Sequence, residues 1–170
     1  RRQQFFSIWI RPVPHHNAHF ALRQAVRELQ MFVEGGLTEV AFGETREFLL
    51  NYSKLYVQTA TRRLGYHMDS MAYGTGYFID EIQQHLSALT VDEVNAAIRR
   101  HLRYDDLAIA IVTNDALDFQ DQLVSNDPSI PIYNAEVPED IRIEDALISV
   151  FDLAISPDRI RVVPVEEMFS

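Results

Sequence analysis

The residues in this sequence whose types and spacing could support chemistry are two histidines in PHHNAHF, residues 14–20. His15 and His19 are four positions apart, so the segment reads H-x-x-A-H. On a helix that begins at Pro14, the two imidazoles would share one face and could hold a metal ion loosely. A metal hydrolase also needs a general base, which in the spacing H-x-x-E-H is a glutamate. Here that position is Ala18, which cannot accept a proton.

We therefore predict no catalytic residue in this chain and no metal site, with His15 and His19 as the only candidates for metal ligands. If Asn17 caps the helix instead, His15 lies outside it and the pair is lost. A solvated helix start is the simplest interpretation of the histidines. No substrate-binding residue is assigned.

Two other groups of residues invite a functional interpretation. Gly74-x-Gly76 lacks the third glycine of a phosphate loop and follows a helical pattern, so it indicates a turn between helices. A polar aromatic cluster could form a binding surface, although packing of the rings against their neighbours is the simpler interpretation. That cluster consists of Tyr66, His67, Tyr73 and Tyr77.

The composition excludes several classes of function. The chain has 170 residues and a net charge of −10, which disfavours nucleic acid and makes basic peptides a more natural partner. No apolar run is long enough for a membrane span. There are no cysteines, which removes thiolate catalysis and disulfides but leaves the compartment unknown, with only a lean towards a periplasmic or secreted parent protein.

Two segments have the pattern of β-strands. FFSIWIRPV, residues 5–13, alternates apolar side chains, and DLAIAIVT, residues 106–113, is an apolar run of buried-strand length. Helical periodicity predicts a helix ending at Gly35-Gly36, a long helix after Thr38 that reaches about residue 71, and a helix over 78–88. A capping box of Thr90 and Glu93 starts another helix, and a short one follows near 116–124.

These elements predict an α+β domain over residues 1–124. The helices after Thr38 and Thr90 would pack on one face of an antiparallel or mixed sheet that contains residues 5–11 and 107–113. Residues 125–170 are predicted to form an extended, proline-rich connection and a C-terminal tail.

Two blocks of sequence resemble a known family. The first is FSIWI, then P-x-x-N-A, then a helix ending in GGLTEVAF; the second is YGTGYFIDEIQQHLSALTVDEVNAAIRRHL followed by an apolar strand. Over about residues 5–114 they are similar to the C-terminal half of the pitrilysin/insulinase and mitochondrial-processing-peptidase family of zinc metallopeptidases, which are inverzincins.

The resemblance implies a non-catalytic half that helps to close a substrate chamber for peptide hydrolysis. The zinc would be held in the catalytic half of the parent protein, and the partners would be that catalytic half, in the same or a partner chain, and a peptide substrate. The family's arginine and tyrosine, seven residues apart, would precede Phe5, and no such pair is present. An inactive family member that serves as a structural or partner subunit, and a stand-alone protein-interaction domain, are the alternatives.

The resemblance also implies an N-terminally truncated domain. The sequence begins RRQQFF without an initiator methionine, so we expect a piece of a longer protein that is inactive alone. A sheet that lacks strands exposes an unpaired edge, and such edges pair with other chains. We therefore expect self-association, by strand addition or by exchange of the tail after Val124.

Overall fold

The computed structural model describes residues 5–168, and every regular element in that range is helical. The chain divides into two compact units. One unit joins the chain up to Met31 to the chain from Arg103 onward, and the other is Phe32–Leu102. The predicted α+β class is therefore wrong for the described part of the chain. The predicted domain boundary after residue 124 stays a prediction.

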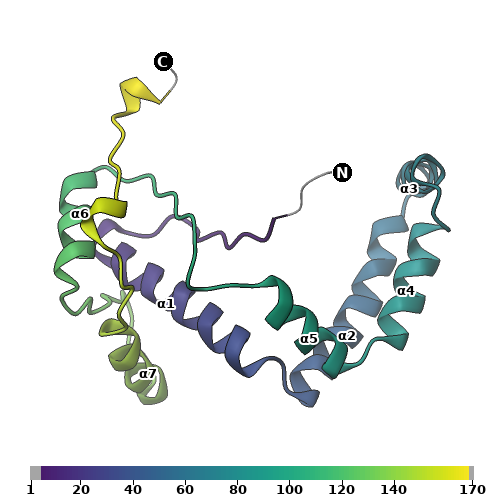
Figure 1. Ribbon diagram of the computed structural model, residues 1–170. Coiled ribbons are helices and arrows are strands. Elements are labelled where there is room, and N and C mark those ends of the chain that lie inside the picture. The colour runs from purple at the N-terminus through teal and green to yellow at the C-terminus, as the bar shows by residue number, and fades with distance from the viewer. Residues whose placement is uncertain (1–4, 169–170) are drawn as a thin grey trace. The chain divides into compact units, whose positions relative to one another are not determined.

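The first unit is built around most of helix α1 (His15–Gly35), with α6 (Ala116–Ser125) and α7 (Glu139–Ser149) beside it (Figure 1). Small and apolar residues recur every four positions along α1 and give it one apolar stripe. Leu22 in this stripe forms a buried cluster with Phe119 and Leu123 of α6. Partly buried apolar side chains surround the cluster: Ala18, Val26, Leu153, Ile155 and Ile160.

The two segments predicted as strands are extended but belong to no sheet. No ladder is assigned to residues 5–13 or 106–113, and among the described residues no backbone hydrogen bond is found for either segment. Their apolar side chains lie in solvent: Phe5 is 86%, Trp9 87% and Val112 93% exposed. Alternation along a sequence favours an extended backbone, but a strand exists only where a second strand supplies hydrogen bonds.

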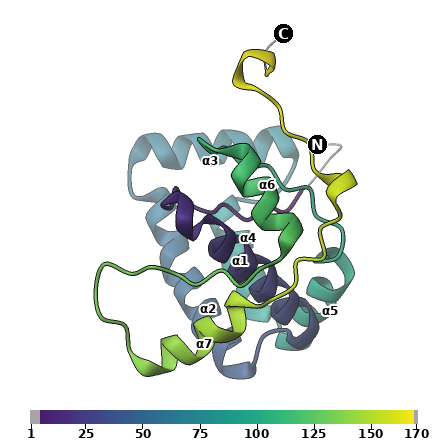
Figure 2. The ribbon, with the colours of Figure 1, turned by 90° about the vertical axis from the view of Figure 1, so that its left-hand side faces the viewer.

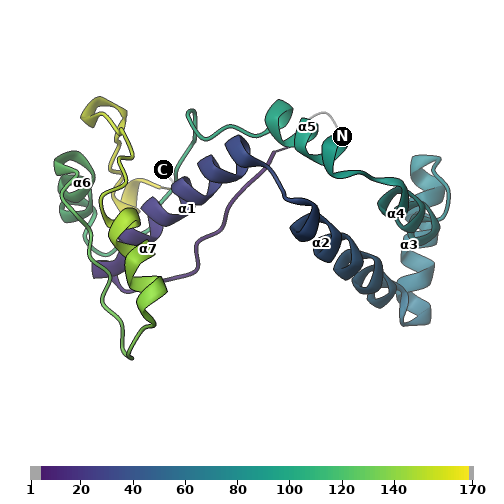
Figure 3. The same ribbon diagram turned by 90° about the horizontal axis from the view of Figure 1, so that it is seen from below.

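The predicted packing of two helices on a sheet is wrong for the same reason. In the second unit, α2 (Glu39–Tyr52) and α4 (Phe78–Ala88) lie side by side, and α3 (Ala60–Tyr73) crosses their ends (Figures 1 and 3). Helix α5 (Val91–His101) follows α4 after a short connection. Helices therefore provide the contacts that a sheet was expected to provide.

The long helix predicted after Thr38 is also interrupted. α2 ends at Tyr52, the 3-10 helix η1 (Ser53–Val57) follows, and α3 begins at Ala60. The hydroxyl of Ser53 donates to the carbonyl of Leu50 at 3.0 Å, and the hydroxyl of Thr59 accepts from the backbone N–H of Arg62 at 3.2 Å. Such bonds from Ser and Thr side chains compete with helix continuation and favour caps.

The local caps are confirmed. Thr38 accepts a hydrogen bond from the backbone of Ala41, and Thr90 with Glu93 forms the full capping box. Gly36 follows the end of α1 with φ +69°, a conformation that glycine adopts at little cost. The helix over 78–88 and the short helix near 116–124 are confirmed as α4 and α6. Gly74 ends α3 in the left-handed conformation, which confirms the turn between helices.

The C-terminal segment has more structure than an extended tail. It contains α7 and two short 3-10 helices, η2 (Pro157–Arg159) and η3 (Val165–Glu167), as Figure 2 shows. The backbone N–H of Ser129 donates to the carbonyl of Ser149 at 3.0 Å, which joins the start of the proline-rich connection to the end of α7. None of the helices in residues 5–168 combines the length and the apolar composition that a membrane crossing requires.

Candidate functional site

Helix α1 starts in the histidine segment. This agrees with the interpretation of the sequence in which His15 lies inside the helix. The helix begins at His15, and Asn17 is not its cap. Instead, the side-chain amide of Asn17 donates to the carbonyl of Ile132 at 3.0 Å and accepts from its N–H at 2.9 Å. His15 and His19 do share a face, and both rings meet the ring of Phe119 edge-on, at 6.3 and 6.4 Å between centroids.

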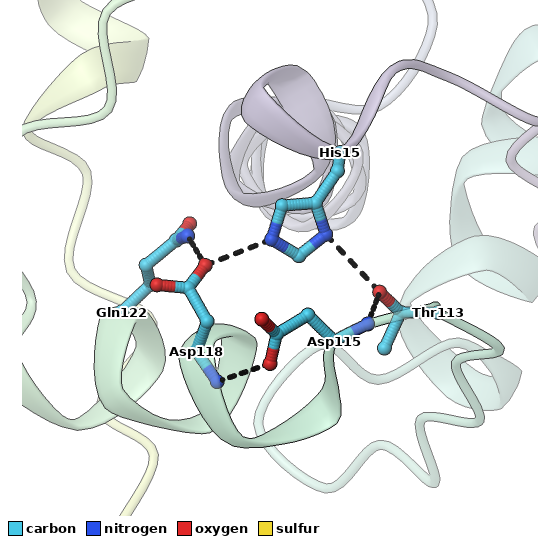
Figure 4. A network of polar contacts seen from close by, with 5 residues as sticks. All are labelled: His15, Thr113, Asp115, Asp118 and Gln122. Atoms are coloured by element: carbon cyan, nitrogen blue, oxygen red, sulfur yellow. Dashed lines mark hydrogen bonds and ion pairs between the residues drawn. The ribbon is translucent and has the colours of Figure 1, made fainter.

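His15 is held by hydrogen bonds at both ring nitrogens (Figure 4). Nε2 lies 2.8 Å from Oδ2 of Asp118, and Nδ1 lies 3.1 Å from Oγ1 of Thr113. Because a carboxylate can only accept, Nε2 carries a proton and donates to Asp118, and Nδ1 shares a hydrogen bond with the threonine hydroxyl. Hydrogen bonds from His15 first and from Gln122 second lower the pKa of the Asp118 carboxyl.

His19 lies in a different environment. Its ring is 2% exposed, and Nε2 is buried without a hydrogen-bond partner among the described residues. Burial first, and the positive charge of Arg23 second, lower the pKa of His19 to about 4. The ring is therefore neutral at pH 7 and packs as a core side chain against Phe119.

The two candidate ligands are thus engaged in other roles. Both nitrogens of His15 have protein partners, and His19 is enclosed by α1 and α6. In the part of the chain that the structure describes, no group of three histidine, aspartate or glutamate side chains is placed to hold a metal ion. The assignment of no metal and no catalytic residue stays a prediction.

Thr113, His15 and Asp118 stand in the order hydroxyl–imidazole–carboxylate, which is the order of a nucleophilic triad. A working triad also needs donors for the developing oxyanion and a cavity for the substrate. The Thr113 hydroxyl accepts from the backbone of Asp115 at 3.3 Å, and neither cavity described for this protein is lined by these residues. We interpret the network as a link between the first turns of α1 and α6.

In the second unit, the structure divides the aromatic cluster predicted from the sequence. Tyr66 stacks on Phe78 at 4.8 Å between centroids and meets Tyr56 at 6.0 Å. The ring of His67 lies near that of Tyr77 instead, with 6.2 Å between the two ring centroids. Tyr73 is 68% exposed at the end of α3. Only Tyr66 of the four predicted residues thus joins a larger aromatic group.

Tyr66 lines a hollow of about 330 Å³ that we call the tyrosine pocket. Its walls come from the end of α2, from η1 and from α3, and consist of Tyr52, Leu55, Tyr56, Arg62 and Tyr66. Sequence reasoning did not identify Tyr52, Tyr56 or Arg62 as site residues. The spacing of Phe48, Tyr52 and Tyr56 by four could have identified the two tyrosines, because it predicts aromatic rings along one helical face.

The glutamates around the first interhelical turn form no candidate site. Glu39 lies in the first turn of α2, where a carboxylate is stabilised by the helix dipole, and Glu44 is exposed.

Comparisons with known proteins give no further assignment. No family model, no curated protein and no solved structure matches the chain.

Proposed function

We propose that this chain is a non-catalytic part of a zinc metallopeptidase of the pitrilysin type and that it serves by binding extended polypeptide. The sequence blocks within residues 5–114 support the peptidase assignment. The α+β fold that the resemblance also implied is wrong for the described residues. The proposed function therefore rests on those sequence blocks and on one structural observation.

That observation is the pair of extended segments in the first unit. For residues 5–13 and 106–113, no strand pairing is found among the described residues, and most of the apolar side chains are exposed to solvent. Unpaired N–H and C=O groups on an extended backbone are a template for strand addition, and main-chain bonds to a bound strand would supply the affinity. A catalytic half, which would hold the zinc, or a peptide substrate could supply that strand.

Amide hydrogen exchange of the full chain tests this proposal. The probe is the basic, strand-forming peptide Ac-KTVTVTVK-NH2, chosen because the chain carries a net charge of −10. We expect the peptide to slow exchange in residues 5–13, 106–113 or both. Ile8→Pro and Ile111→Pro each remove one backbone donor and should abolish protection in their own segment.

Asn134→Pro, in an exposed loop between α6 and α7, is the matched control and should leave the protection unchanged. Absence of protection, or protection confined to other segments, would show that these segments do not bind extended polypeptide.

A stand-alone protein-interaction domain is the second candidate, and it is compatible with the helical structure of the described residues because it implies no particular fold. Strand addition would serve either role. The two differ in partner: a peptidase half should bind a zinc-containing catalytic half and raise its peptide hydrolysis. A stand-alone interaction domain should change no peptidase activity.

A further inference from the structure

One stretch of the second unit has a charge opposite to that of the whole chain. Residues 48–68 contain no aspartate or glutamate, but they contain Lys54, Arg62 and Arg63. The complete sequence has 25 acidic and 15 basic residues. A local basic region in an acidic protein attracts anions to one place on its surface.

The tyrosine pocket lies within this stretch. Tyr52 meets Tyr56 edge-on at 5.5 Å, and Tyr52 stacks on Phe48 at 5.4 Å. Tyr56 and Tyr66 continue the series to Phe78. Rings that support one another in this way present fixed faces, and Tyr52 and Tyr56 are still 42% and 37% exposed. Such faces accept a flat or apolar group with little loss of side-chain entropy.

Arg62 supplies a cation at the wall of the pocket. Its Nη1 donates to the carbonyl of Leu55 at 3.4 Å, a long contact that orients the side chain across η1. A guanidinium has five N–H donors in a planar fork, so Arg62 retains donors for a carboxylate. Arg63 is the next residue but does not line the pocket; its Nη1 donates to the carbonyls of Val57 and Gln58 at 3.2 and 3.3 Å.

We propose that the tyrosine pocket binds an acidic peptide segment, in which a carboxylate flanks an aromatic or large apolar side chain. The side chain contacts Tyr52, Tyr56 and Leu55, and the carboxylate pairs with Arg62. A net charge of −10 opposes longer polyanions, so a short peptide fits better than nucleic acid or an anionic bilayer. This proposal concerns other residues than the extended segments of the first unit and does not depend on strand addition.

Four blocked tripeptides separate the contributions that the peptide's charge and its aromatic ring make to binding. They are Ac-Glu-Phe-Glu-NH2, Ac-Gln-Phe-Gln-NH2, Ac-Lys-Phe-Lys-NH2 and Ac-Glu-Ala-Glu-NH2. Binding to the full chain is followed by shifts of the tyrosine ring signals in NMR spectra, titrated at low and high salt. We expect the first peptide to bind most tightly. Salt should weaken its binding, because the contact between carboxylate and guanidinium is exposed.

Arg62→Gln should weaken binding of Ac-Glu-Phe-Glu-NH2 roughly 5- to 20-fold, the range for losing a charge-assisted hydrogen bond at a partly exposed site. Arg63→Gln removes the same charge from the next position and is the matched control, with an expected change of less than about twofold. Tyr52→Leu keeps an apolar wall but removes a ring, and should reduce the preference for phenylalanine over alanine.

Three outcomes would overturn the proposal. The first is equal or weaker binding of the acidic peptide compared with the neutral and basic ones. The second is an equal loss of affinity in the two arginine variants, which would indicate diffuse attraction. The third is binding of phosphatidylserine vesicles that depends on Arg62, without binding of the peptide, which would assign the surface to a membrane instead. Circular dichroism of each variant confirms that its helices are retained.

Discussion

The buried guanidinium of Arg23 in α1 donates to the backbone carbonyl of Ser149 at the end of α7, 126 positions later in the chain. The same group donates to the carbonyls of Asn126 and Asp127 at 3.0 and 2.9 Å, and to two side-chain oxygens. Arg23 is 0% exposed. Burial lowers its pKa, while the charges of Asp152 and Asp127 oppose that effect. One buried cation thus joins the end of α7 to the chain that follows α6 through several hydrogen bonds.

Arg23→Ala should therefore destabilise the protein by about 3–5 kcal/mol, because it removes all of these hydrogen bonds together with the packing of a fully buried side chain. Urea denaturation followed by circular dichroism measures the change. Arg27→Ala is the matched control one helical turn away, where the side chain pairs with Glu28 and Glu144 near solvent. Its expected cost is below about 1 kcal/mol. Equal costs for both variants would show that the Arg23 contacts do not stabilise the unit.

The free energy of unfolding should fall as the pH is lowered from about 6.5 to about 4. The pKa of His19 is about 4 in the folded chain, against 6.5 for an unperturbed histidine, so the unfolded chain binds more protons in this window. The stability from the neutral buried ring is complete above pH 6.5 and is lost as the pH falls. The full difference amounts to roughly 3 kcal/mol.

His19→Phe tests this pH dependence, because phenylalanine fills a similar volume and has no proton to bind. Urea midpoints measured between pH 4 and 7 should change less in this variant than in the parent chain. His16→Gln, at an exposed position in the same turn, should keep the full pH dependence. A variant at position 19 with the same slope as the parent would assign the proton uptake to another group.

The sequence-based predictions that the structure confirms depend on neighbouring residues. The box of Thr90 and Glu93 is complete within four positions, and Gly36 needs only its own backbone angle. The strands failed because alternation over residues 5–13 fixes an extended backbone but not a partner strand. The Arg23 contacts were missed because they join segments more than 100 positions apart.

The features of the candidate site also divide into those that follow from a local sequence pattern and those that do not. The shared face of His15 and His19 follows from their spacing on one helix, and it was one of the two alternatives that the sequence left open. The hydrogen bond between His15 and Asp118 spans 103 positions and was not predictable from any local pattern. Tyr66 was named from the sequence because of its aromatic neighbours. Arg62 was not, since its role depends on the turn of the chain through η1.

We expect no stoichiometric zinc on this chain after dialysis, and no peptide hydrolysis with zinc added. The reason is that Ala18 cannot act as a general base and that both nitrogens of His15 have protein partners. Metal analysis by mass spectrometry measures the zinc content per chain. One tightly held zinc per chain, lost in the double variant His15→Ala, His19→Ala, would contradict this expectation.

The chain should also self-associate as its concentration rises. The extended segments expose apolar side chains, including Ile10 at 45% and Ile111 at 44% exposure, and among the described residues their backbones make no backbone hydrogen bond. Light scattering at several concentrations measures the association. Ile10→Lys with Ile111→Lys should reduce it, whereas Val165→Lys, at a position 70% exposed outside both segments, should not. A monomer at every concentration would contradict association through these segments.

Gly36→Ala should destabilise the second unit by about 1–3 kcal/mol, because position 36 has φ +69° and a Cβ there would lie 2.6 Å from Oδ1 of Asn95. That amide cannot retreat freely. Its Oδ1 accepts from the N–H of Leu37 at 2.8 Å, and its Nδ2 donates to the carbonyl of Leu37 at 3.0 Å. Gly35→Ala is the matched control, since a Cβ at Gly35 meets open space at the end of α1 and favours the helix.

Asn95→Ala separates the two causes of that loss. In the Gly36→Ala background it removes the steric contact, so the double variant should lose less stability than the two single variants added together. Urea denaturation of the four chains gives the interaction free energy. Strict additivity would mean that the positive φ alone disfavours alanine at position 36 and that Asn95 moves aside. A non-additive result would mean that the contact between Asn95 and the turn that joins α1 to α2 disfavours alanine at position 36.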